Sequence, residues 1–129
     1  MNKYTFSRKF ITKSADFIIE AIKVKLKEDG FFLGVGQGKK YMVNRFSSTS
    51  IYYTGIARNQ SKQEDFDIEE LKTAIEIMKR LPDFTTNTDL LKEKISTAMY
   101  RKRTPLFGVL THTGVIVEVE EKPEEKPEE

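Results

Sequence analysis

The sequence predicts an α+β domain: an N-terminal helix and a small antiparallel β-meander, then a three-helix winged-helix-like unit with a closing strand. Three observations lead to this prediction. Apolar residues recur at helical spacing before residue 30, short β-type runs follow, and helical spacing returns after residue 67. We place one compact domain at 1–119, with the helix and meander in 1–62 and the helices and closing strand in 67–119.

The first helix is expected over residues 14–29. Ser14 is a suitable N-cap and Gly30 a suitable C-terminal stop. Apolar side chains between them recur at helical spacing: Phe17, Ile18, Ala21, Ile22 and Leu26. Residues 22–27 also alternate between apolar residues and lysine, as a half-buried strand does. Helix is favoured because the periodic set begins earlier, while partial strand character stays open.

A three-stranded meander is expected next, with strands at 31–33, 41–43 and 51–54, and residues 59–65 are expected to form a polar loop. Three glycines precede Lys39 and Lys40 in the first connection. A P-loop would need glycine at 33 and Ser or Thr at 40, and a Rossmann fingerprint would need glycine at 39. We therefore predict a hairpin whose tip carries two lysines able to touch a phosphate backbone.

Three helices and a strand complete the prediction. Asp67, with Glu70 three residues later, forms a capping box for a helix that ends at residues 81–82. A second helix opens at 88 or 89 and runs through Ala98 or Met99. A third begins at 104–105 and ends at Gly114. Val115, Val117 and Val119 form the closing strand. The expected shared core contains Leu71, Ile75, Leu91, Ile95, Leu106, Phe107 and Leu110.

Charge is distributed unevenly along the chain. The net charge is +2, but residues 118–129 hold seven acids and two lysines, so residues 1–117 carry +7. The tail, 120–129, has no apolar anchor and is expected to be disordered. A basic body favours nucleic acid or an acidic protein surface as the partner.

The basic run Arg101, Lys102 and Arg103 lies just before the third predicted helix. Such side chains neutralise phosphates, Thr104 can donate a hydrogen bond at the helix start, and Tyr100 can stack on an unpaired base. A solvated helix end is the alternative interpretation. The candidate nucleic-acid-binding residues are Lys39, Lys40, Lys92, Lys94, Tyr100, Arg101, Lys102, Arg103 and Thr104.

Residues 67–119 resemble the winged-helix, or helix-turn-helix, superfamily in element order and in the closing run 110–116. The resemblance implies that the third helix enters a DNA groove and that the following strand begins a wing. That helix, however, carries outward residues such as Thr111 and His112 rather than the Arg, Asn or Gln of bidentate base contacts. Any binding is therefore expected to be directed mostly at the backbone.

The predicted function is a small, non-enzymatic, cytoplasmic, regulatory protein that binds nucleic acid, with DNA favoured over RNA. Its size and acidic tail also suit a phage or mobile-element protein. The chain has no Cys, and we expect no cofactor, no metal site and no membrane partner. The single histidine, His112, is expected to cap a helix end.

Two other functions remain open. A protein-binding inhibitor or adaptor would use the aromatic pairs at 31–32 and 52–53 to cover a partner's active surface. A metal-dependent nuclease would use the acids between Glu64 and Glu70, although the start of a helix also explains most of them. The sequence leaves specificity and oligomeric state open.

Overall fold

The computed structural model describes residues 2–36, 38–56 and 62–119, and the predicted acidic tail, 120–129, lies outside these ranges. The elements in chain order are β1 (Tyr4–Phe6), α1 (Ala15–Asp29), β2 (Phe31–Leu33), β3 (Lys40–Phe46), β4 (Ser50–Gly55), β5 (Gln63–Asp67), α2 (Ile68–Arg80), α3 (Asp89–Lys94), α4 (Thr97–Arg101), α5 (Arg103–His112) and β6 (Ile116–Glu118). The predicted α+β class is confirmed.

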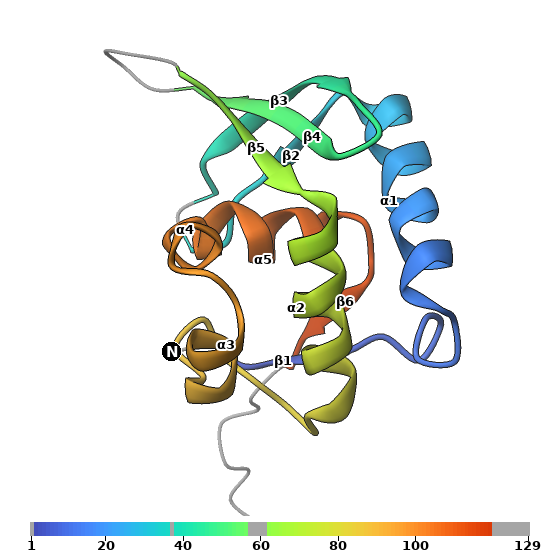
Figure 1. Ribbon diagram of the computed structural model, residues 1–129, viewed down its shortest axis with the longest axis vertical. Coiled ribbons are helices and arrows are strands. Elements are labelled where there is room, and N and C mark those ends of the chain that lie inside the picture. The colour runs from blue at the N-terminus through green and yellow to red at the C-terminus, as the bar shows by residue number, and fades with distance from the viewer. Residues whose placement is uncertain (1, 37, 57–61, 120–129) are drawn as a thin grey trace, which may run out of the picture.

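Two antiparallel sheets are formed, one with strand order β2-β3-β4-β5 and one with β1 paired to β6. In Figure 1 the four-stranded sheet lies above α5, α2 stands in front of α5, and β1 and β6 lie at the opposite end of the molecule. Within the described ranges, every helix is too short or too polar to cross a lipid bilayer.

The meander has one strand more than the sequence predicted. Residues 63–65, which we assigned to a polar loop, belong to β5, and β5 pairs along β4. Only Phe66 of this strand is buried, because β5 lies at the edge of the sheet and exposes most of its side chains. A polar edge strand gives no alternating pattern, so the prediction was wrong here.

The caps of α1 and α2 are those predicted. The Ser14 side chain accepts a hydrogen bond from the Phe17 amide, and Gly30 ends α1 in the left-handed conformation, with φ of 78°. The Asp67 side chain accepts from the Glu70 amide at 3.1 Å and starts α2. These local contacts fix where each helix begins, independently of tertiary packing.

The second predicted helix is broken into α3 and α4. Ile95 is extended, with φ of −102° and ψ of 162°, and Ser96 then caps α4 by accepting from the Met99 amide at 3.0 Å. The inward residue is Met99, since Ala98 is exposed. The prediction of one helix was wrong because Ser96 starts a new cap instead of continuing the helix.

Helix α5 is buried from Pro105 to Leu110, while both of its ends reach the surface. The expected face of Leu106, Phe107 and Leu110 is in the core, and so is every other residue from Pro105 to Leu110. All seven residues of the predicted shared core belong to one cluster of buried side chains. A helical segment whose side chains are apolar on every side is typical of the centre of a core.

The closing strand pairs with β1 rather than with the four-stranded sheet. Phe6 lies opposite Ile116 in this pairing, and the Val119 amide donates to the Lys3 carbonyl at 2.9 Å. Val115 and Ile116 point into the core, whereas Val117 and Val119 are exposed. Strand β1, which contains three residues, was not predicted.

Candidate nucleic-acid interface

A cleft of about 360 Å³ lies between the end of the sheet and the junction of α4 with α5. It brings together Lys39 and Arg101, which are far apart in the chain. Its lining consists of Lys39, Tyr41, Gly55, Lys62, Glu64, Arg101, Lys102, Thr104 and Pro105. Four lining residues are basic and one is acidic, so the cleft has a net positive charge.

The hairpin between β2 and β3 positions Lys39. As predicted, the glycines at 34, 36 and 38 lie in the connection, where the Gly34 amide donates to the Lys39 carbonyl at 2.7 Å. The ammonium of Lys39 lies 5.9 Å from the centre of the Tyr41 ring at the mouth of the cleft. Burial, followed by the charge of Glu64, raises the pKa of Tyr41, so its hydroxyl remains protonated and can donate.

The run Arg101, Lys102 and Arg103 occupies three different environments. Arg101 is exposed and lines the cleft. Lys102 also lines the cleft, but its ammonium donates to the Asp65 carbonyl and lies 3.9 Å from the Asp65 carboxylate. Arg103 instead lies 4.5 Å from the centre of the Tyr100 ring and donates to the Tyr100 carbonyl at 3.2 Å.

Because of these contacts, the three basic residues cannot act as one group, although they are consecutive in the sequence. Lys102 joins the α4–α5 junction to β5, where Asp65 also accepts from the Ser50 hydroxyl at 2.8 Å. One face of Tyr100 is covered by Arg103, which leaves less of that ring for a base. Arg101 is therefore the member of the run best placed for a phosphate.

The cations of the cleft are largely uncompensated. Among the residues that the structure describes, no carboxylate lies within ion-pairing distance of Lys39, Lys62 or Arg101. Thr104, at the start of α5, adds a hydroxyl at the same wall. Three unpaired cations and a hydroxyl around a small hollow suit a phosphate group.

Lys62 is a lining residue that the sequence analysis missed. It directly precedes β5, in a stretch that we had assigned to a loop. Its charge was visible in the sequence, but its place beside Lys39 follows from the pairing of β4 with β5, which was not predicted.

Five of the nine predicted residues do not line this cleft: Tyr100 and Arg103, described above, and Lys40, Lys92 and Lys94. Lys40 is on the other side of β3, with its ammonium 4.6 Å from the centre of the Phe31 ring. Lys92 and Lys94 are exposed on α3, and Lys94 lines a different hollow. The nine candidates therefore do not form one site.

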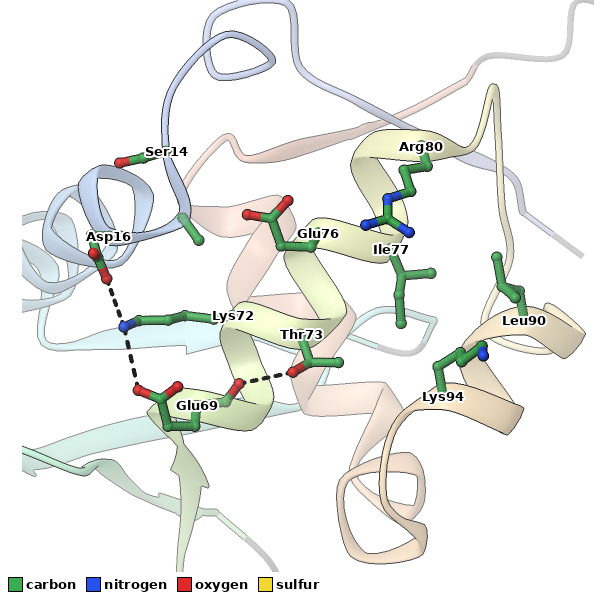
Figure 2. Close-up of a pocket in the computed structure, with 11 residues that line it drawn as sticks. Ser14, Asp16, Glu69, Lys72, Thr73, Glu76, Ile77, Arg80, Leu90 and Lys94 are labelled. Carbon is green, nitrogen blue, oxygen red and sulfur yellow. Dashed lines mark hydrogen bonds and ion pairs between the residues drawn. The ribbon is translucent and has the colours of Figure 1, made fainter.

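The second hollow is larger, about 650 Å³, and lies between the start of α1, α2 and α3. Figure 2 shows Lys72 between Asp16 and Glu69, at 2.6 and 3.3 Å, and hydrogen bonds to these two acids raise the pKa of Lys72. Its bases are Lys72, Arg80 and Lys94, and its acids are Asp16, Glu69 and Glu76. Because the charges balance, this hollow is less suited to a polyanion than the smaller cleft.

His112 ends α5, as predicted, and pairs with a residue of α1. Its Nε2 lies 2.8 Å from the Asp29 carboxylate, and its ring meets Phe31 edge-on at 5.4 Å. The hydrogen bond from His112 is the main cause of a lowered pKa for Asp29, and Lys25 at 3.5 Å adds to the effect.

This contact predicts a pH-dependent stability. A carboxylate with a depressed pKa stabilises the fold above its ordinary value of 3.8, and this contribution is lost as the pH falls through the lower folded-state pKa. The difference in unfolding free energy between wild type and Asp29→Asn should thus be larger at about pH 5 than at about pH 2. Urea titrations across this range measure it, and a difference that does not change with pH would contradict the assignment.

The acids considered for a nuclease have other observed contacts. Asp67 caps α2, and Asp65 bonds Ser50 and Lys102. Within the described ranges, no three His, Cys, Asp or Glu side chains are grouped closely enough to hold a metal ion. In comparisons with known proteins, no family model, curated protein or solved structure matches this chain.

Proposed function

We propose that this protein binds nucleic acid without catalysing a reaction, and that the basic cleft is where it contacts the phosphate backbone. One observation carries the proposal: Lys39, Lys62 and Arg101 come from three separate segments and meet at one hollow without carboxylate partners among the described residues. Folding brings these like charges close together, and their electrostatic repulsion is relieved when a polyanion binds.

The geometry favours backbone contact over base reading. A groove-entering helix must expose a face, and residues Pro105 to Leu110 of α5 are all buried. The groove entry implied by the winged-helix resemblance is therefore not part of the proposal. Phosphate contacts set position and orientation without specifying sequence, so binding should be broadly tolerant of sequence.

The proposal predicts a specific salt dependence. Replacing Lys39 and Arg101 with alanine removes two phosphate contacts, so affinity should fall for every sequence. The slope of log affinity against log salt should flatten by roughly one unit per lost contact. Anisotropy titrations of labelled DNA across a salt series measure both effects.

The matched control is Lys92→Ala with Lys94→Ala, which removes the same charge from α3, away from the cleft. For this control, the slope of log affinity against log salt should stay close to that of the wild type. Equal losses in both double variants would show that net charge acts without a site. If the folded wild type binds no DNA or RNA even at low salt, the proposal is wrong, and a stoichiometric complex with a protein would support the inhibitor or adaptor role instead.

A further inference from the structure

The four-stranded sheet has a second face that the described helices leave largely open (Figure 1); His112 of α5 meets it only at Phe31, on the edge strand β2. Its strand register places Phe31 beside Met42, Met42 beside Thr54, and Arg45 beside Tyr52. Lys40 lies beside Leu33 on the same side. We call this surface the open face; its residues are Phe31, Leu33, Lys40, Met42, Asn44, Arg45, Tyr52, Thr54, Gln63 and Asp65.

The open face is more apolar than an ordinary solvated sheet surface. Leu33 is 45% exposed at the end of the edge strand β2, and Met42 is 38% exposed in the inner strand β3. Phe31 and Tyr52 are half-buried beside them. An exposed apolar patch rimmed by polar groups marks a contact surface for a ligand or another macromolecule.

Both aromatic rings on the open face carry a cation. The Arg45 guanidinium lies 3.8 Å from the centre of the Tyr52 ring, and the Lys40 ammonium lies 4.6 Å from the centre of the Phe31 ring. Each cation covers one face of its ring, as Arg103 does on Tyr100, so at Tyr52 the plane offered to an unpaired base is the Arg45 guanidinium, which the ring supports. A duplex keeps its base faces inside the helix, so only a single strand can use such a surface.

The open face and the cleft lie on opposite sides of the same end of the four-stranded sheet. Lys39 lines the cleft while its neighbour Lys40 is on the open face, and Lys62 lines the cleft while its neighbour Gln63 is in β5 beside Thr54. The amide of Asn44 donates to Thr54 at 2.7 Å and to Gln63 at 3.0 Å, which ties three strands together at this point. A strand whose phosphates lie in the cleft thus reaches the open face by passing around this end of the sheet.

We infer that the ligand is single-stranded nucleic acid, with its backbone at the basic cleft and its bases stacked on the open face. The inference rests on the proposed function and names its substrate class. Charge on the open face suits a polyanion: Lys40 and Arg45 are cationic, and the one carboxylate, Asp65, lies 3.9 Å from the Lys102 ammonium.

Tyr52→Ala and Met42→Glu test the open face separately from the cleft. Tyr52→Ala should weaken binding to labelled oligothymidylate or oligouridylate by about tenfold, the loss expected for one stacked base. Its affinity for a DNA duplex of equal length should not change. Met42→Glu should act in the same direction, and Tyr52→Phe should retain binding because the ring remains.

Two exposed residues of α1 provide matched controls. Phe17 is 51% exposed and has the Lys13 ammonium 5.0 Å from its ring centre, so Phe17→Ala removes a comparable cation–ring pair. Val24 is 61% exposed, so Val24→Glu adds the same charge as Met42→Glu elsewhere. Neither control should alter single-strand binding, and circular dichroism should show that all variants are folded.

The outcomes separate the inference from the proposal on which it rests. If the cleft variants weaken all binding but Tyr52→Ala weakens single strands and duplex equally or not at all, the cleft remains and the open-face inference is overturned. If no nucleic acid binds, both fail. Self-association that Met42→Glu abolishes, without any single-strand binding, would assign the open face to a second copy of the chain and would also overturn the inference.

Discussion

Replacing Phe107 with alanine is expected to destabilise the fold by about 3–5 kcal/mol, which is enough to unfold many domains of ordinary stability. Phe107 is 1% exposed, and its ring meets Tyr4 and Phe84 edge-on at 5.2 and 5.9 Å. Truncation leaves a cavity where α5, β1 and the segment after α2 meet. Denaturant titrations monitored by circular dichroism measure the loss.

Phe17→Ala is the control for this experiment. The same atoms are removed from a side chain that is 51% exposed, so the effect should be about 0.5 kcal/mol or less. A nearly neutral Phe107→Ala would contradict the central position of α5.

The second large effect is expected at Gly108. In an ordinary helix, Gly→Ala stabilises by about 1 kcal/mol. Here an added Cβ would lie 2.4 Å from the Leu33 carbonyl oxygen and 2.6 Å from the Gly34 Cα, and both are backbone atoms that cannot rotate away. Gly108→Ala should therefore destabilise the fold by about 2 kcal/mol or more, because α5 must move away from β2.

Gly114→Ala separates crowding from backbone strain. Gly114 has a φ of 79° but open space where a Cβ would lie, so this variant should cost only about 1 kcal/mol. If Gly108→Ala is instead as stable as wild type in thermal and denaturant unfolding, α5 and β2 do not approach as closely as described.

The features predicted correctly from the sequence were those that depend on a few neighbouring residues. Ser14, Gly30 and Asp67 mark helix ends because each acts through a hydrogen bond or a backbone conformation close by in the chain. Leu106, Phe107 and Leu110 were placed in the core by their spacing, which depends only on helix geometry.

Features that depend on tertiary contacts were missed. Ser96 can either continue a helix or cap a new one, and the packing of α4 decides between these. From the sequence alone, Gly108 is only a residue of low helix propensity; its close approach to β2 is seen only in the fold. Strand β5 carries polar residues because it lies at an edge, so its pattern is that of a loop.

The candidate site was predicted only in part, because its assembly also depends on tertiary contacts. Charge alone identified Arg101 and Lys39 as candidates, but no sequence pattern distinguishes Arg101, which faces the cleft, from Arg103, which packs on Tyr100. The relation between the cleft and the open face depends on strand register, because neighbouring residues such as Lys39 and Lys40 lie on opposite sides of β3.

The pairing of β1 with β6 affects how the chain folds during its synthesis. Of the described elements, β1 leaves the ribosome first and β6 last, yet each is the other's partner in the two-stranded sheet. Among the described residues, the native β-partner of β1 that emerges before β6 is Phe84, which forms two backbone hydrogen bonds with Tyr4. Val115 and Ile116 reach the core at the same late point. A nascent chain that stops short of residue 115 therefore lacks both this sheet and part of the core, and the native fold is completed only after nearly all of residues 1–119 have been translated.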